Sequence, residues 1–228
     1  MLGLLKTTKL HFIGIGGIGM SGIAEVLLDL GYSVSGSDLN SSATVENLKH
    51  KGAIIHIGHS ASNIGDASLV VYSSAIDHKN PEVIQALESK IPMIRRAEML
   101  AELMRLKFGI AIAGSHGKTT TTSLIATIFQ EAKKDATHII GGIVSNLGGN
   151  ARKGDGDFLI AEADESDGSF IHVPPTYSIV TNIDREHMDY YDSMKDLKNL
   201  FIKFINKVPS FGKSFICIDD KNNNDLLK

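Results

Sequence analysis

Short apolar runs alternate with amphipathic stretches through the first 106 residues. The apolar run at Lys9–Ile15 predicts a buried strand, and apolar positions from Met20 to Leu30 then recur on one helix face until Gly31 stops the helix. The same alternation predicts strands at 32–36, 53–57, 69–73 and 92–94, and helices at 43–51, 80–89 and 95–106. Strands that alternate with helices predict a parallel sheet with helices on both faces, which is the Rossmann-like class.

The pattern starts again near residue 107. The apolar run at Ile110–Ala113 predicts a strand, which a glycine turn connects to a helix whose apolar positions reach Phe129. Signals are weaker up to a strand at Asp157–Ala163; a helix at 195–207 and strands at 177–183 and 214–219 follow. We therefore predict two α/β units, residues 1–106 and 107–228. No Gly/Ser-rich linker marks the boundary, but 228 residues are enough for two cores.

Composition narrows the choice of partners and compartment. The chain is 43% hydrophobic and 21% charged with a net charge of −3, and no block of like charge indicates a nucleic-acid or membrane surface. We therefore expect small-molecule partners. The single cysteine, Cys217, lies in an apolar run and predicts a buried strand thiol in a reducing compartment. The N-terminal MLGLLKTTKL has too short an apolar run for a signal peptide, so we expect a cytoplasmic protein.

The strand–turn–helix at 110–129 predicts a phosphate site. Gly114 opens the turn and Gly117-Lys118-Thr119 begins the helix, which brings free backbone N–H groups, the positive end of the helix dipole, a lysine and a hydroxyl to one place. Polyphosphate with magnesium fits that place. The loop is shorter than the standard P-loop, whose first glycine would fall at Ile112. The alternative interpretation is a tight turn with a threonine-rich first helical turn.

A second glycine loop follows the first predicted strand. Gly14, Gly16 and Gly19 match G-x-G-x-x-G, and Asp38 ends the second strand nineteen residues after Gly19, near the position of a ribose-binding carboxylate. This spacing is typical of a dinucleotide-binding half. Ligands bind beyond the carboxyl ends of parallel strands, where this loop would meet the turn at 73–75.

Acidic residues follow another predicted strand. Glu162, Asp164, Glu165 and Asp167 lie within six positions, and a solvated loop is the common explanation for such a cluster. A phosphate loop, however, needs a carboxylate at a neighbouring strand end to hold its metal, which favours a metal role for at least one of them. His187 also follows a strand at the same expected edge and is a candidate for a metal or phosphate contact.

In order and spacing, several stretches together resemble the Mur ligase family of ATP-dependent amide-forming enzymes in peptidoglycan synthesis. The match is nearest to the branch that uses UDP-N-acetylmuramate, ATP and L-alanine, and the short loop is that family's own form of the phosphate loop. The stretches are FIGIGGIGMSGIAE (12–25), GYSVSGSD (31–38), IPMIRRAEMLAELMR (91–105), AGSHGKTTTT (113–122), IAEADESDGSF (160–170) and VTNIDREHMDYY (180–191).

The resemblance implies roles for individual residues. Lys118, Glu162 and His187 would be catalytic, and Thr119, Glu162 and His187 would hold Mg²⁺. ATP would bind at Gly114, Ser115, His116, Gly117, Lys118, Thr119 and Thr120. The first glycine loop would bind the diphosphate of a UDP-sugar instead of NAD, with the site formed by Gly14, Gly16, Gly17, Gly19, Met20, Ser21, Asp38, Ser73 and Ser74.

The implied reaction passes the γ-phosphate of ATP to the lactyl carboxylate, and L-alanine then attacks the acyl phosphate. The family's C-terminal domain is not recognisable and the central domain is expected to be incomplete, so we expect this chain to be an inactive fragment. Three alternatives stay open at this point. They are a ligase of the same family that recycles murein tripeptide, a nucleotide-binding module without catalysis, and a nicotinamide dehydrogenase, which would leave Lys118 and Glu162 unexplained.

Overall fold

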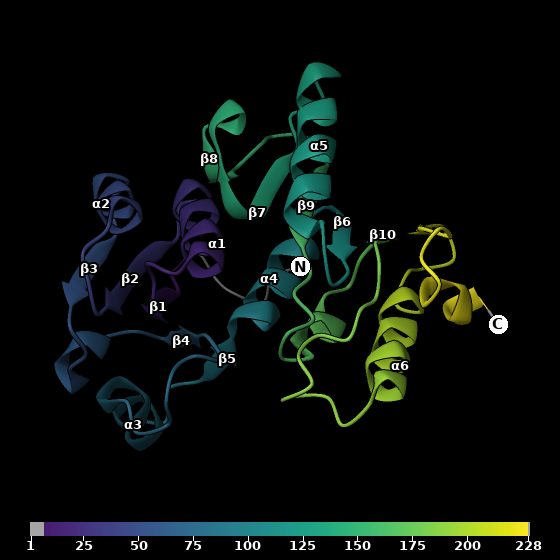
Figure 1. Ribbon diagram of the computed structural model, residues 1–228. Coiled ribbons are helices and arrows are strands. Elements are labelled where there is room, and N and C mark those ends of the chain that lie inside the picture. The colour runs from purple at the N-terminus through teal and green to yellow at the C-terminus, as the bar shows by residue number, and fades with distance from the viewer. Residues whose placement is uncertain (1–6, 228) are drawn as a thin grey trace.

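Two sheets lie next to one another in the computed structural model, which describes residues 7–227 (Figure 1). The first sheet has the strand order β3-β2-β1-β4-β5 and all of its pairs are parallel. This order and the alternation with helices confirm the Rossmann-like prediction. Its elements are β1 (Lys9–Ile13), α1 (Ile18–Asp29), β2 (Ser33–Asp38), α2 (Ala43–His50), β3 (Ile54–Ile57), β4 (Leu69–Tyr72), α3 (Pro81–Glu88), β5 (Met93–Arg95) and α4 (Arg96–Met104).

The second sheet is mixed, with the order β11-β10-β6-β9-β7-β8, and its β7–β8 pair is antiparallel. The other four neighbouring pairs run parallel, as the prediction of a P-loop-type α/β unit requires. Its elements are β6 (Phe108–Ala113), α5 (Lys118–Glu131), β7 (Thr137–Val144), β8 (Gly149–Arg152), β9 (Phe158–Glu162), β10 (Tyr177–Val180), α6 (Met194–Ile205) and β11 (Lys213–Ile216).

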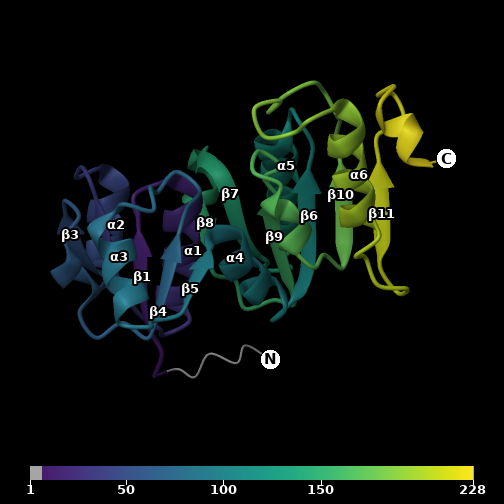
Figure 2. The ribbon, with the colours of Figure 1, turned by 90° about the horizontal axis from the view of Figure 1, so that it is seen from below.

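Helix α1 of the first sheet packs on strands of the second, so the two sheets share a core (Figure 2). One hydrophobic cluster joins Ile23 and Leu27 of α1 to Ile139 of β7 and Ala151 of β8. Polar contacts strengthen the junction, because the side-chain amide of Asn150 donates to the carbonyl of Ile18 at 2.8 Å and to the Ser21 hydroxyl at 3.2 Å. The division of the chain near residue 107 stays a prediction.

A buried carboxylate fixes the end of β2. Glu82 is fully buried, and one of its oxygens accepts from the Ser37 hydroxyl at 2.6 Å and lies 3.1 Å from Nε2 of His11. The other accepts from the Asn63 amide at 2.7 Å and from the Ser60 N–H at 3.2 Å. Burial alone would raise the pKa of Glu82, but the hydrogen bonds from His11, Ser37 and Asn63 outweigh it and lower the pKa to about 2. The network therefore positions the end of β2, where Ser37 precedes Asp38.

Two features of the second unit correct the sequence-based expectations. Strands β7 and β8 have no clear signal in the sequence, because Gly141 and Gly142 interrupt the apolar run of β7 and its second half is partly exposed. Cys217 is exposed and follows β11, so the prediction of a buried strand thiol is wrong. The reason is that β11 forms the edge of the sheet and most of its residues face solvent. Among the described residues, no helix is both long and apolar enough to cross a bilayer.

His138 on β7 makes the stability of this fold depend on pH. Its side chain is buried, and among the described residues Nε2 has no hydrogen-bond partner. Burial, with Arg152 nearby, lowers the pKa of His138 to about 4. Unfolded chains bind this proton at a pH of roughly 6.5, so between the two values the unfolded state carries more protons and stability falls as the pH falls.

We expect the wild-type chain to lose about 3 kcal/mol of unfolding free energy, relative to His138→Phe, between pH 6.5 and pH 4. Phenylalanine keeps a flat buried ring but cannot be protonated, so the difference isolates this one group. Urea denaturation of both proteins across this range provides the measurement. Parallel pH profiles would mean that His138 titrates normally in the folded chain.

Candidate nucleotide and substrate site

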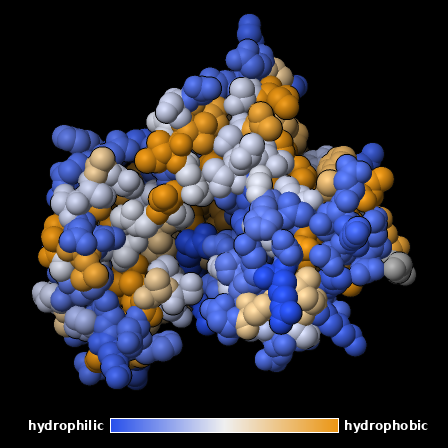
Figure 3. All heavy atoms as spheres, in the orientation of Figure 1, coloured by the Kyte–Doolittle hydropathy of each residue, from blue (hydrophilic) through white to orange (hydrophobic). Residues whose placement is uncertain are grey.

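A cavity of about 370 Å³ lies between the two sheets, at the carboxyl ends of their strands. The surface is hollowed between the two halves of the molecule in Figure 3. Residues that precede and begin α1 form one wall with the turn after β4, and residues of β7, β9 and the start of α5 form the other. The cavity therefore brings the two glycine-loop regions to a single space.

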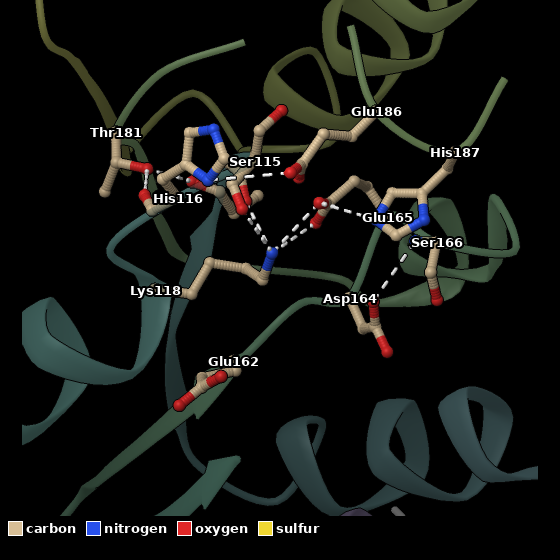
Figure 4. A network of polar contacts seen from close by, with 12 residues as sticks. Ser115, His116, Lys118, Glu162, Asp164, Glu165, Ser166, Thr181, Glu186 and His187 are labelled. Carbon is tan, nitrogen blue, oxygen red and sulfur yellow. Dashed lines mark hydrogen bonds and ion pairs between the residues drawn. The ribbon is translucent and has the colours of Figure 1, made fainter. Parts of the chain in front are cut away.

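Lys118 begins α5 and turns its amine back over the loop. Nζ donates to the carbonyl oxygens of Gly114 at 2.6 Å and Ser115 at 3.2 Å, and it lies 2.9 Å from the carboxylate of Glu165 (Figure 4). The amine is thus at the centre of the loop, at the position from which a lysine charge reaches bound phosphates. The strand, loop and helix start expected from the sequence are all present.

The segment after β10 holds the phosphate loop in shape. The N–H of His116 donates to the side-chain oxygen of Asn182 at 2.8 Å, and the Thr181 hydroxyl donates to the His116 carbonyl at 2.7 Å. The N–H of Asp184 donates to the Ser115 hydroxyl at 2.8 Å. The imidazole of His116 is about half exposed and its Nε2 lies 3.4 Å from the carboxylate of Asp184. These contacts tie the loop to the segment that follows β10.

Glu162 ends β9 on the other side of the lysine. One carboxylate oxygen accepts from the Thr119 hydroxyl at 3.2 Å and the other from the N–H of Gly141 at 2.8 Å. Burial raises the pKa of Glu162 above its usual range, and the contacts with Gly141 and Thr119 oppose that rise. The two oxygen donors that the sequence assigned to a magnesium ion, Thr119 and Glu162, thus lie within contact of one another.

His187 lies apart from that pair. Its Nε2 is 3.6 Å from the carboxylate of Glu165, and ligand atoms of Glu165, Glu186 and His187 all fall within 4.8 Å of each other. Figure 4 shows Glu162 on the other side of the Lys118 amine from His187. The backbone of His187 has φ = 57°, an uncommon conformation that often marks functional positions. Among the described residues, His187 pairs with Glu165, whereas Thr119 and Glu162 pair with each other, so the metal role of His187 stays a prediction.

Glu165 is a site residue to which the sequence analysis gave no individual role. Its side chain is 1% exposed, between Lys118 and His187, so a solvated loop is wrong at this position. Burial raises the pKa of Glu165, and the Lys118 amine opposes that rise. The Tyr191 hydroxyl donates to the backbone carbonyl of Glu165 and anchors the loop. The sequence shows only that Asp164 and Glu165 follow a buried strand. It does not show which of the two side chains is buried next to Lys118.

The first unit contributes most of its expected residues to the cavity. Three positions of the proposed UDP-sugar site do not line it: the N–H of Gly16 donates to the Asp38 carboxylate at 2.8 Å, and the Ser21 hydroxyl donates to the Ile18 carbonyl at 3.0 Å. A Cβ on Gly16 would lie 2.9 Å from the Asp38 carboxylate and 3.0 Å from Val45, so packing within the protein requires this glycine. The positions that do line the cavity are Gly14, Gly17, Gly19, Met20, Ser73 and Ser74.

The fold and the two glycine loops define an α/β protein with a Rossmann-like unit and a P-loop-type unit, which contribute residues to one cavity. The chain belongs to the Mur ligase family: residues 9–108 match the model described as "Mur ligase family, catalytic domain", and residues 112–228 match that of the Mur ligase middle domain. This confirms the resemblance derived from the motifs.

The relatives that the chain resembles include two ligases of the same name. The chain is 60% identical to the UDP-N-acetylmuramate–L-alanine ligase of Pelagibacter ubique over 98% of its own length and 48% of that relative. It is 60% identical to the ligase of the same name from Desulfotalea psychrophila, over 93% of the chain and 47% of the relative. The chain therefore spans about half the length of the curated relatives that it matches.

Solved structures show the same likeness. The crystal structure of UDP-N-acetylmuramate–alanine ligase from Thermotoga maritima superposes with a TM-score of 0.87 and 32% identity, covering 96% of this chain and 51% of that one. The structure of UDP-N-acetylmuramate:L-alanyl-gamma-D-glutamyl-meso-diaminopimelate ligase from Neisseria meningitides gives a TM-score of 0.90 and 26% identity, with 97% and 74% covered.

Proposed function

We propose that this chain carries the sugar-nucleotide and ATP sites of a ligase that joins L-alanine to UDP-N-acetylmuramate in peptidoglycan synthesis. The observation that carries the proposal is the shared cavity, where Gly14, Gly17 and Gly19 of the first loop face Lys118 and Glu162. In such an arrangement a sugar nucleotide held at the first loop extends toward the γ-phosphate of ATP held at the second. The proposal includes a boundary near residue 107 and a cytoplasmic location.

The residues of the second unit suit phosphoryl transfer. Lys118 would contact the terminal phosphates, and the N–H groups at the start of α5 would donate hydrogen bonds to the phosphate oxygens. Thr119 and Glu162 offer the oxygen ligands that Mg²⁺ prefers, and the fit is good because the two already lie in contact. When bound, the ion would neutralise charge on the phosphates during transfer. We also propose that His187 contributes to metal binding, from the side of Glu165.

A second ligase of the family remains the competing proposal. The neighbour from Neisseria meningitides, whose name includes the tripeptide L-alanyl-gamma-D-glutamyl-meso-diaminopimelate, has a TM-score of 0.90. Sequence identity favours the L-alanine enzyme, at 60% against 26%. A nucleotide-binding module without catalysis is the third possibility, and it follows from the half-length match. A nicotinamide dehydrogenase is disfavoured, because it would give Lys118 and Glu162 no role.

We expect UDP-N-acetylmuramate to stabilise the chain against heat more than NAD does. A ligand that binds only the folded state adds RT ln(1 + [L]/Kd), so a hundredfold excess over Kd should raise the melting temperature by about 5 °C or more. Dye-monitored melting with each ligand at equal concentration measures this. Stabilisation by NAD and none by the UDP-sugar would overturn the proposed ligand.

We expect the 228 residues alone to release no phosphate from ATP in an L-alanine-dependent manner. Amide formation requires the acyl phosphate and the amine to be held within about 3.5 Å, and positioning of this kind supplies roughly 7–11 kcal/mol of the barrier. We propose that the amine site lies in the half of the relatives that this chain does not match. A phosphate-release assay with and without L-alanine tests the expectation.

A chimera provides the positive control for that assay. Joining residues 1–228 to the unmatched half of the Pelagibacter ubique ligase should give L-alanine-dependent turnover. The same chimera with Glu162→Ala should be inactive, because Thr119 would lose its partner carboxylate at the proposed metal position. Turnover by the short chain at the rate of the chimera would show that the site needs nothing beyond these residues.

A further inference from the structure

Arg96 brings a positive charge into the cavity from the first unit. It is the first residue of α4, and its side chain is 21% exposed. Among the described residues that line the cavity, Arg96 and Lys118 are the two basic ones. Lys118 belongs to the phosphate loop of the second unit, so each unit places one cation in the shared space.

The guanidinium of Arg96 lies against the first glycine loop. A Cβ on Gly19 would be 3.0 Å from Nη1 and 3.2 Å from Cδ of Arg96, so the absence of a side chain at this position lets the arginine approach. Gly19 is in the first turn of α1, whose N–H groups point toward the cavity end of the helix. The start of such a helix favours negative charge, and the arginine adds a full positive charge beside it.

Asp164 holds the guanidinium from the opposite wall. Nη2 of Arg96 donates to the Asp164 carboxylate at 3.1 Å, and Asp164 lies two residues beyond the end of β9. A guanidinium carries five N–H donors in a planar fork that matches phosphate oxygens. The ion pair with Asp164 fixes the plane of that fork and leaves other donors for a ligand in the cavity.

We propose that Arg96 binds the diphosphate of the sugar nucleotide through the guanidinium donors that its ion pair with Asp164 leaves free. The inference rests on the proposed function, since it concerns the same ligand. The competing explanation is that the Arg96–Asp164 pair only joins the two units. The two explanations differ in what the carboxylate contributes, because a structural pair needs both partners equally, whereas diphosphate binding needs only the cation.

Calorimetric titration with uridine diphosphate and with uridine separates the two explanations. We expect Arg96→Gln to weaken binding of uridine diphosphate about tenfold or more and to leave uridine within about twofold. Asp164→Asn should bind uridine diphosphate at least as tightly as the unchanged chain, because it removes an anion that competes for the guanidinium. Arg105→Gln, a charge-matched change at the other end of α4, should bind both ligands normally.

Three results would overturn the inference. The first is equal affinity of Arg96→Gln and the unchanged chain for uridine diphosphate, which leaves the proposed function intact. The second is a loss in Asp164→Asn as large as that in Arg96→Gln, which would show a structural pair. The third is no binding of uridine diphosphate or UDP-N-acetylmuramate by the unchanged chain, which overturns the proposed ligand as well. If Arg96→Gln does not fold, Arg96→Lys replaces it, with a loss of about threefold or more expected for uridine diphosphate alone.

Discussion

Lys118→Ala should bind magnesium-ATP at least about tenfold more weakly than the unchanged chain. The amine donates to the carbonyls of Gly114 and Ser115 and so lies at the centre of the loop, next to the proposed phosphate position. A hydrogen bond to a charged group contributes about 1.5–3 kcal/mol. The substitution also leaves the buried carboxylate of Glu165 without the cation 2.9 Å away, so the local structure loses a second contact. Calorimetric titration with magnesium-ATP measures the difference.

Lys203→Ala is the matched control for this experiment. Lys203 lies in the last turn of α6, exposed and outside the cavity, so its removal changes the net charge equally without touching the loop. We expect its ATP affinity to equal that of the unchanged chain. Equal affinity of all three proteins would refute the assignment of the loop, and an equal loss in both variants would indicate a general charge effect.

Gly114→Ala should destabilise the chain on the order of 3–4 kcal/mol and abolish ATP binding. Gly114 has φ = 139°, which an L-residue rarely adopts, and a Cβ at this position would be 2.0 Å from the Thr181 hydroxyl and 3.0 Å from the Asn182 carbonyl. Backbone strain and overpacking each cost about 1–3 kcal/mol. The loop would have to move away from β10, which now holds it. Urea denaturation gives the stability, and titration gives the affinity.

Gly117→Ala in the same loop separates strain from overpacking. Gly117 also has a positive φ, of 79°, but nothing lies within 4 Å of a Cβ built there. Its cost should therefore be that of a left-handed alanine alone, about 1–2 kcal/mol. If the two variants are equally stable, the close approach of Gly114 to Thr181 and Asn182 has no energetic weight.

The sequence predicted the elements that repeat the strand–helix alternation and missed those that do not. Strands β1 and β4 in the interior of the first sheet have buried apolar runs, which are visible without knowledge of their neighbours. Strands β7 and β8 bury residues against α1, which is over 100 positions earlier in the chain. Such burial depends on a long-range contact that local periodicity does not record. The exposure of Cys217 likewise depends on which strand forms the edge of the sheet.

The sequence predicted which residue types form the candidate site, but not which side chains contact one another there. The loop around Lys118 and the carboxylate of Glu162 could be identified, because strand ends of a parallel sheet meet at one edge. The spacing of Asp164 and Glu165 could not show that the first turns to Arg96 and the second to Lys118. That choice depends on the shape of the turn after β9. Arg96 itself had only the signature of an amphipathic helix.

The packing of α1 on β7 and β8 has a mechanical consequence. The contact combines apolar side chains from both units with the hydrogen bonds of Asn150. If the two units moved apart at this contact, apolar surface would be exposed to water and the polar groups around Asn150 would lose their hydrogen bonds. The packing of α1 on β7 and β8 therefore opposes hinge motion between the two units. It also fixes the distance between the first glycine loop and Lys118. Any domain that closes over the reacting groups must therefore rotate about a different hinge.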